Sequence, residues 1–424
     1  MSLVGLSFAY LRDRALNTAL NILLLTLGVA TMVILVLFSA QLGERFERDA
    51  RGIDLVVGAK GSPLQLILSS IYQVDIPTGN IPLTTVETLR ADPTVGEVIP
   101  LAQGDSFRGF RIVGTEPAYV AHYGGELAQG RLWSEPLETV LGAEVARQTG
   151  AGLGQKFVGS HGLSGDGHEH DATPFTVVGI LAPTGTVADR LILTSVESVW
   201  DVHGVAHESQ EDGAHDHEHE HEHEHAEEAA APANASIREA HSAPEVTALL
   251  VKYRSPLAAV RLPNFINQQT ALQAAAPAVE TARLLSLVGV GLDAARGFAV
   301  LLIATSGLSI FVALYTALRQ REGDMAMLRV MGARPAAIFG QVMLEGLLLA
   351  AAGALLGLAV GHGVVALAAQ AIPQLRDMGL SGAVFEPAEA WILAGALFMG
   401  GLAALIPAAR VFQVDIADTL QQVS

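Results

Sequence analysis

The chain consists of four long apolar runs and one long polar block, and this pattern predicts a membrane protein. Each run reaches the roughly 20 apolar residues that an α-helix needs to cross a bilayer. The runs are Ala19–Ala40, Gly297–Ala317, Phe339–Ala369 and Ala390–Ala409. A soluble protein with buried core helices is the alternative, but four such runs are hard to bury in a chain of 424 residues.

The runs divide the chain into spans, one large domain and short connections. The first run is too long for the apolar core of a signal peptide, so we expect a retained helix. The expected parts are an elbow at 1–18, a span at 19–40, the domain at 41–284, a stalk end and span at 285–318, a turn at 319–336, a span at 337–371, a loop at 372–388, a span at 389–411 and a tail at 412–424.

Basic residues in the short connections predict the orientation of the spans. Arg12 and Arg14 precede the first span, four arginines lie in the turn at 319–336, and Arg410 ends the last span. Because such residues concentrate on the cytoplasmic side, we expect both termini and the turn to be cytoplasmic and the domain to be external. The elbow is expected to lie on the inner leaflet with its apolar side chains facing lipid. These side chains are Leu3, Leu6, Tyr10 and Leu11.

The block at 41–284 mixes strand and helix patterns, which predicts an α+β domain between the first and second spans. Short β-branched runs predict strands at Gly109–Gly114, Phe175–Leu181, Arg190–Thr194 and Val246–Tyr253. Thr84–Asp92 and Glu138–Thr149 are expected to be helical. The block holds 33 acidic and 16 basic residues, and this negative balance argues against a nucleic-acid partner.

Two segments that flank the domain have the patterns of stalk helices. Gln41–Asp54 continues the first span as a charged helix. Leu257–Leu292 is apolar at helical spacing and is expected to descend into the second span. Because proline interrupts helices, we expect this segment to be kinked or restarted at Pro263 and Pro277.

A histidine-rich tract inside the domain predicts metal binding. The segment at 203–241 has too little apolar surface to fold alone, so we expect a disordered loop. Neutral imidazole and carboxylate groups bind zinc, nickel and copper, and we favour zinc. The expected ligands are His215, His217, His219, His221, His223 and His225, with weaker candidates His203, His207, His168 and His170. The alternative is a solvated acidic linker in which the histidines are incidental.

Two ionisable residues lie inside the third apolar run. His362 is interpreted as a histidine near a membrane face or in a satisfied packing contact, although intramembrane ionisable residues are often functional. Glu345 is expected at a seam between helices. The chain contains no G-x-x-x-x-G-K-[ST], H-E-x-x-H or G-x-S-x-G motif and no cysteine. We therefore expect no enzymatic activity, no P-loop binding of ATP and no disulfide.

Three stretches resemble the MacB/FtsX-like permeases (type VII ABC transporters), which include the lipoprotein-releasing LolC and LolE proteins. Arg321-Glu-Gly-Asp-Met-Ala-Met-Leu-Arg-Val-Met-Gly-Ala333 is similar to the family's R-x-x-E-I-x-x-L-R-x-x-G-A, with Asp324 in place of Glu and Met325 in place of Ile. Asp54–Leu68, running on to Pro77–Asn80, looks like the start of the family's periplasmic domain. Pro407–Leu420 is similar to the family's closing motif but lacks its second proline and final arginine.

The resemblance implies a permease subunit in a bacterial inner membrane, with a periplasmic domain of the MacB type. It implies mechanotransmission by a homodimer, or by a pair of related permeases, bound to a cytoplasmic ATPase dimer that holds the ATP. The turn then couples the two proteins, its apolar side filling a groove and its arginines meeting acidic residues. The expected coupling residues are Arg319, Arg321, Glu322, Asp324, Met325, Leu328, Arg329, Met331, Gly332 and Arg334. The alternative for the arginines is contact with lipid headgroups alone.

Other functions remain open at the level of sequence. Metal could be cargo, regulator or co-substrate of the transporter. An FtsX-type scaffold that activates a periplasmic protein partner, and a LolC/LolE-like permease that extracts lipoprotein or lipid without a metal role, are two alternatives. A membrane metal sensor that signals through the stalk without an ATPase is a third, which the 319–333 motif disfavours.

Overall fold

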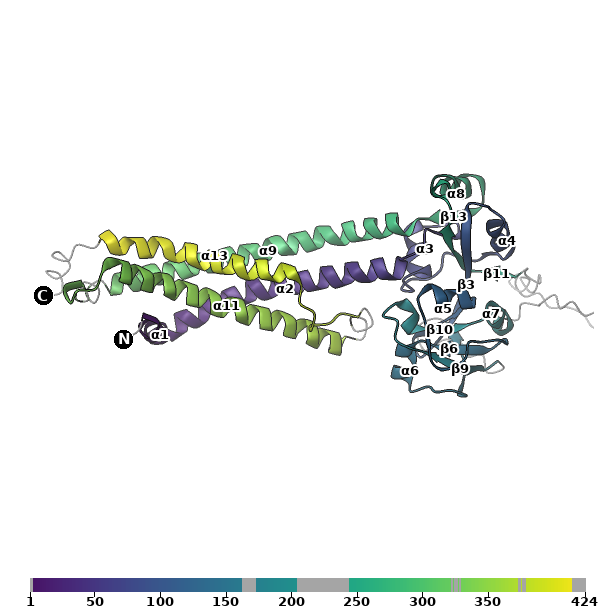
Figure 1. The fold of residues 1–424 in the computed structure, drawn as a ribbon, viewed down its shortest axis with the longest axis horizontal. Helices are drawn as coiled ribbons and strands as arrows, with labels where there is room; N and C mark the ends of the chain where they lie inside the picture. The colour runs from purple at the N-terminus through teal and green to yellow at the C-terminus, as the bar shows by residue number, and fades with distance from the viewer. Residues whose placement is uncertain are drawn as a thin grey trace, which may run out of the picture. The chain divides into compact units, whose positions relative to one another are not determined.

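The chain forms two compact units. The structure, a computed structural model, describes residues 3–161, 173–203, 244–321, 323, 327, 329–372, 375 and 379–413. One unit comprises Met1–Arg45 and Leu285–Ser424, and the other comprises Phe46–Leu284. The first holds the apolar helices and the second holds the α+β domain (Figure 1). The boundaries between them fall inside α2 (Ala15–Ala50) and α9 (Pro277–Gln320).

The membrane unit confirms the arrangement of one span followed by three. Within the described residues, four helices are long and apolar enough to cross a membrane: α2, α9, α11 (Pro335–Ala371) and α13 (Pro387–Arg410). Helix α1 (Leu3–Asp13) precedes them, and the 3-10 helix η2 (Val411–Gln413) follows. Proline at the first helical position begins both α11 and α13, where its fixed φ angle suits a helix start.

Glycines on α11 allow close contact with α2. Gly353, Gly357 and Gly361 follow one another at intervals of four residues, so they lie along one face of the helix. A Cβ atom added at Gly357 would lie 2.6 Å from the Cβ of Val29, and the other two positions are similarly tight against α2. Small residues therefore bring the two backbones together, as is usual where helices pack inside a bilayer.

The domain unit is built on one mixed sheet. Among the described residues, the sheet has eleven strands, and its main path runs β13-β1-β12-β3-β4-β10-β6-β9-β5. The strands of this sheet are β1 (Leu55–Ala59), β3 (Val95–Phe107), β4 (Phe110–Gly114), β5 (Leu127–Gly130), β6 (Glu138–Leu141), β7 (Lys156–Phe157), β8 (Ser160–His161), β9 (Phe175–Leu181), β10 (Leu191–Thr194), β12 (Ala248–Tyr253) and β13 (Leu272–Ala275). β2 (Ile81–Pro82) and β11 (Glu245–Val246) form a separate pair.

The pairing in this sheet joins distant parts of the sequence. β1 pairs antiparallel with β12, with Leu55 opposite Val251, and β10 pairs parallel with β4. The helices of the domain are α3 (Pro63–Ser70), α4 (Thr84–Arg90), α5 (Pro117–His122), α6 (Ala143–Thr149), α7 (Val196–His203) and α8 (Pro256–Gln269), with the 3-10 helix η1 (Val187–Arg190). Buried apolar side chains fill both faces of the sheet, which confirms the α+β prediction.

Three of the four expected strands are confirmed, and the fourth, Val246–Tyr253, is divided at Thr247 into β11 and β12. The helix expected at Glu138–Thr149 is only partly present. Its first four residues form β6, and the helix α6 begins at Ala143. β6 lies between β10 and β9, where Thr139, Val140 and Leu141 are buried. Pairing on both sides therefore overrides the local helical pattern. The helix expected at Thr84–Asp92 is confirmed as α4.

The segment at Leu257–Leu292 is not one stalk, and this prediction was wrong in part. It forms α8, then strand β13, and only then α9, which restarts at Pro277 as expected. Pro263 lies inside α8 without ending it. The side chain of Asn267 accepts a hydrogen bond from the backbone N–H of Ala274 at 2.7 Å and donates one to its carbonyl at 3.0 Å. These bonds fold β13 back against α8, so the stalk begins only at Pro277.

The N-terminal elbow is helical, but two of its side chains do not face lipid as expected. Leu11 packs against a core cluster that includes Ile310 and Leu314 of α9. Tyr10 lines a cavity between α1, α9 and α11. The side chains of Leu3 and Leu6 lie outside the described residues. The ring of Tyr10 gains a cation–π contact with the neighbouring Arg321, which it would lose if it faced lipid.

Candidate functional site

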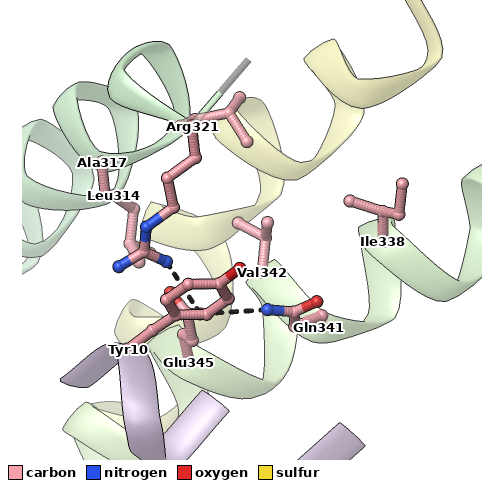
Figure 2. A pocket seen from close by; sticks show the side chains of 9 residues that line it. Tyr10, Leu314, Ala317, Arg321, Ile338, Gln341, Val342 and Glu345 are labelled. Carbon is pink, nitrogen blue, oxygen red and sulfur yellow. Dashed lines mark hydrogen bonds and ion pairs between the residues drawn. The ribbon is translucent and has the colours of Figure 1, made fainter. Parts of the chain in front are cut away.

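A cluster of polar side chains lies where α1, α9 and α11 meet, at the end of the membrane unit that adjoins the 319–336 turn. A cavity of about 20 Å³, close to the space that one water occupies, lies among them. Tyr10, Arg321, Gln341 and Glu345 supply its polar lining, and apolar side chains of α9 and α11 close the rest (Figure 2). Four polar groups in an apolar helix bundle are expensive unless they satisfy one another.

Arg321 and Glu345 form a buried ion pair at the centre of this cluster. The Nη1 atom of Arg321 donates to Oε1 of Glu345 at 3.4 Å, and the two side chains are 13% and 6% exposed. Gln341 donates from Nε2 to the same oxygen at 3.5 Å (Figure 2). The guanidinium carbon of Arg321 lies 3.6 Å from the ring centroid of Tyr10, within the range of a cation–π contact. One arginine therefore links the end of α9 to both α1 and α11.

Local sequence explains why these side chains converge. Arg321 follows the last residue of α9, and its backbone N–H still bonds to the carbonyl of Leu318 at 3.1 Å. Gln341 and Glu345 stand four residues apart on α11, so they share one face. Leu318 near the end of α9 and Ile338 near the start of α11 line the same cavity, so the two helix ends lie near one another. Arg321 can therefore reach back to Glu345.

Further arginines surround this end of the bundle. Arg410, the last residue of α13, donates from Nη1 to the hydroxyl of Tyr315 at 2.7 Å, and Arg319 lies 5.6 Å from the centre of the same ring. Arg14 donates to the side-chain oxygen of Gln320. The end of the bundle that was expected to be cytoplasmic is therefore rich in arginine, and Glu345 compensates one of these charges inside it.

The structure describes some of the expected coupling residues and not others. Glu322, Asp324, Met325 and Leu328 lie outside the described residues. Met331 is 70% exposed, Gly332 has a left-handed φ of 96°, and Arg334 directly precedes the first turn of α11. Arg321, which was expected to meet an acidic partner residue, is instead buried against Glu345. In this structure its guanidinium group therefore contacts Glu345 and Tyr10 of the same chain.

Sequence reasoning missed two exposed residues of the turn and two members of the polar cluster around Arg321. Met327 and Val330 are 60% and 64% exposed, so the described part of the turn presents three large apolar side chains with Met331. Tyr10 and Gln341 were not expected to support the turn. The spacing of Gln341 and Glu345 on an otherwise apolar helix was the available signal, because two polar residues on one face need a shared partner.

A second polar cluster lies near the opposite end of α11. Nδ1 of His362 lies 2.8 Å from the carbonyl oxygen of Gly382, and Nε2 lies 3.0 Å from Oε2 of Glu389. Both ring nitrogens therefore have partners, and the interpretation of His362 as a satisfied packing contact is confirmed. Glu389 also completes a capping box with Glu386 at the start of α13. The cluster fastens the loop before α13 onto α11.

The expected metal ligands cannot be placed. His207, His168, His170 and the six histidines of the dense tract lie outside the described residues, and so does the side chain of His203 at the end of α7. Among the residues that the structure does describe, no group of three or more His, Cys, Asp or Glu side chains could hold a metal ion. Zinc binding by the tract stays a prediction.

Two family models together match most of the chain. The model described as the MacB-like periplasmic core domain matches residues 18–260, and the model described as the FtsX-like permease C-terminal matches residues 296–416. The comparison with curated proteins found no match.

Similar solved structures include two extracytoplasmic domains. The periplasmic region of MacB from Actinobacillus actinomycetemcomitans is 13% identical, with a TM-score of 0.33, over 56% of this chain and 95% of that one. The extracellular domain of the noncanonic ABC-type transporter YknZ from Gram-positive bacteria is 12% identical, with a TM-score of 0.29, over 52% of this chain and 98% of that one.

Proposed function

The chain belongs to the MacB/FtsX family of ABC transporter permeases, and we propose that it transmits movement from a separate cytoplasmic ATPase to its own external domain. Family membership implies the ATPase partner, and the chain itself carries no phosphate-binding loop motif. ATP is therefore held by the partner. The mechanical role, the site of docking and the orientation in the membrane are our proposals.

The contact of Arg321 with both α1 and α11 is the observation that carries the proposal. A force applied to the turn after α9 reaches Arg321, whose side chain contacts Tyr10 on α1 and Glu345 on α11. Three helices then respond together. α9 is continuous over 44 residues, about 66 Å at 1.5 Å per residue, whereas the hydrocarbon core needs only about 30 Å. A helix of this length is suited to carry displacement beyond the bilayer.

The exposed apolar side chains of the turn are proposed to dock into a groove of the ATPase. Met327, Val330 and Met331 are large, flexible or β-branched, and more than half exposed. Short helices commonly bind partner grooves through such apolar side chains. Arginines around the turn then favour an ATPase surface with acidic residues at its rim.

We propose a bacterial inner-membrane location with both termini and the turn in the cytoplasm and the domain in the periplasm. The arginines at the turn, at Arg14 and at Arg410 support this orientation, because basic residues concentrate on the cytoplasmic side. We also propose a homodimer on an ATPase dimer, as the family resemblance implies. An FtsX-type scaffold and a lipid-extracting or lipoprotein-extracting permease remain the competing functions, since they use the same coupling turn.

The histidine tract favours a link to zinc as an addition to this function. Six histidines alternate with carboxylates between His215 and His225, a composition suited to many weak interchangeable sites. Replacing these six histidines with serine should abolish zinc binding by the purified protein in calorimetry. In the unaltered protein, affinity should fall as the pH drops through about 6.5, because imidazole binds metal only when deprotonated. Equal zinc binding by both proteins would contradict the metal role.

Co-purification with the ATPase tests the proposed docking. Met331→Asp places a charge on an exposed apolar position of the turn, and it should lower recovery of the ATPase by about tenfold or more, equivalent to roughly 1.4 kcal/mol of binding. Ile76→Asp is the matched control, because Ile76 is 72% exposed but lies in the domain. Equal recovery with both variants would contradict docking at this turn.

A further inference from the structure

A buried tyrosine joins the end of α2 to the beginning of α9 inside the domain unit. The hydroxyl of Tyr72 lies 2.6 Å from the hydroxyl of Thr281, in the second turn of α9. The same hydroxyl lies 3.3 Å from the carbonyl oxygen of Phe46, near the end of α2, to which it can donate. Tyr72 is 3% exposed and Thr281 is 7% exposed. One hydroxyl group therefore contacts both of the helices that enter the domain.

The local backbone fixes Tyr72 in this position. Tyr72 lies just after α3, and the next residue, Gln73, has a φ of 58°, which non-glycine residues adopt only under constraint. Gln73 donates from Nε2 to the carbonyl of Ser70 at 2.9 Å, and its Oε1 accepts from Nε2 of Gln103 on β3 at 3.0 Å. The side chain of Gln73 thus connects this turn both to the end of α3 and to β3. These bonds hold the backbone of Tyr72 in place next to the sheet.

The end of α2 is held at further points around Tyr72. The rings of Phe46 and Tyr72 lie 4.6 Å apart, and the hydroxyl of Tyr123 donates to the carbonyl of Asp49 at 3.0 Å. The buried side chain of Asp49 accepts a bond from the backbone N–H of Val187, in η1, at 2.9 Å. Phe46 and Asp49 thus hold the end of α2 to the domain at several points. The hydroxyl of Thr281 in turn ties the first turns of α9 to Tyr72.

We propose that Tyr72 is a positioning residue, whose hydroxyl makes the domain-side ends of α2 and α9 move as one body with α3. This inference rests on the proposed function, because the coupling matters only if the two helices carry displacement. Burial raises the pKa of Tyr72 to about 12, so the hydroxyl stays neutral and keeps its proton over the physiological range. Thr281 has no titratable group. The contacts of the Tyr72 hydroxyl with Thr281 and with the Phe46 carbonyl, which we call the joint, are therefore insensitive to ordinary changes of pH.

The bridge can be removed from either side with little change of shape. Tyr72→Phe keeps the ring that packs on Phe46, and Thr281→Val keeps the branched side chain of threonine. Thr281→Ser restores a hydroxyl at the same position and serves as the conservative rescue. Thr139→Val is the matched control for stability, because Thr139 is also buried and donates to the carbonyl of Thr176 at 3.2 Å, between β6 and β9.

Spin-label distances across the joint test the proposal in the full chain. The sequence contains no cysteine, so Glu47→Cys on α2 and Ala282→Cys on α9, both exposed positions, can be labelled without interference. In the protein without its ATPase, the distance distribution should be narrow with Tyr72 and Thr281 present. It should become at least twice as broad with Tyr72→Phe or Thr281→Val. Thr281→Ser and Thr139→Val should keep the narrow distribution.

The same labels in the complex with the ATPase separate this inference from the proposed function. Trapping a nucleotide state should leave the distance unchanged in the unaltered joint and should shift it in Tyr72→Phe. Equal widths in all variants, or a joint that opens with nucleotide in the unaltered protein, would overturn the proposal. The widths of the distance distributions are measured without any ATPase. A failure of the ATPase to bind would therefore contradict the proposed function but would not affect the comparison of widths.

Discussion

Gln41 of α2 pairs with the backbone of Ser381 through both polar atoms of its side-chain amide. Its Nε2 donates to the carbonyl of Ser381 at 2.9 Å, and its Oε1 accepts from the N–H of Ser381 at 2.8 Å. The side-chain amide of Gln41 thus satisfies both backbone polar groups of Ser381, as a neighbouring β-strand would do. The ring of His362 on α11 contacts the carbonyl oxygen of the next residue, Gly382. This loop is therefore fastened to two helices of the membrane unit.

Replacing Gln41 should free this loop. Gln41→Ala removes two hydrogen bonds of about 1 kcal/mol each, so exchange of the Ser381 amide should accelerate by about tenfold or more in hydrogen-exchange measurements. Thr31→Val is a suitable control, because Thr31 donates only to the carbonyl of Leu27 within α2. Unchanged exchange at Ser381 would show that the loop is held without Gln41.

The ion pair between Arg321 and Glu345 should behave as a coupled unit. Removing one partner leaves a buried charge, so Arg321→Met or Glu345→Leu alone should destabilise the chain by about 3–5 kcal/mol. Replacing both with apolar residues (Arg321→Met with Glu345→Leu) should cost less than the sum of the single changes, because no charge remains unpaired. Unfolding of the four proteins in detergent gives the double-mutant cycle, and additive effects would contradict the coupling.

The close contact of α11 with α2 should tolerate no side chain at Gly357. Gly357→Ala would place a Cβ against the side chain of Val29, and overpacking of this kind typically costs about 1–3 kcal/mol. Gly363→Ala on the same helix is the control, because no atom lies within 4 Å of a Cβ added there. Alanine favours a helix over glycine, so the control should be neutral or slightly stabilising in thermal unfolding. Similar losses in both variants would refute the packing argument.

Glu138 should make the stability of the domain depend on acid pH. The bond from Arg131, together with the backbone N–H groups of Ser134 and Glu135, lowers the pKa of Glu138 to about 2. A carboxylate whose pKa is lower in the folded chain stabilises it above the unfolded value of about 4.5 and loses this effect as the pH falls through about 2. Because Arg131 is exposed and solvent screens the pair, we expect only about 1–2 kcal/mol.

Comparing Glu138→Gln with the unaltered chain measures this contribution. The difference in stability should be constant from pH 7 to about 5.5 and should shrink between about pH 4.5 and 2, where the folded carboxylate finally accepts a proton. Glu87→Gln, at an exposed position on α4, is the control for loss of a carboxylate elsewhere in the domain. A difference between the proteins that grows as the pH falls would contradict the sign of the shift.

The sequence predicted the membrane helices well because their signal is local. A bilayer demands about 20 apolar residues in succession, so Ala19–Ala40 alone identifies α2. The strands at Phe175–Leu181 and Arg190–Thr194 were also visible, since β-branched residues alternate there. β1 and β13 were missed because they become strands through long-range pairing, β13 with β1 and β1 with β12, which no local pattern encodes.

The candidate site was predictable in its place but not in its contacts. The arginine pattern located the turn after α9, and Glu345 was expected at a helix seam. The partner of Glu345 could not be identified, because an arginine at the end of a membrane helix has several acceptable partners, including lipid headgroups. Tyr10 belongs to a different part of the chain, and only the fold brings its ring within 3.6 Å of the Arg321 guanidinium carbon.

Accessibility of the turn tests the central claim, that energy enters from the cytoplasm at this site. Met327→Cys adds the only cysteine in the chain at a position that is 60% exposed. Gln148→Cys, at an exposed position on α6, is the control on the other side. In intact cells, a membrane-impermeant maleimide should label Gln148→Cys and should label Met327→Cys only after the membrane is opened. Labelling of Met327→Cys in intact cells would place the turn outside and contradict the account.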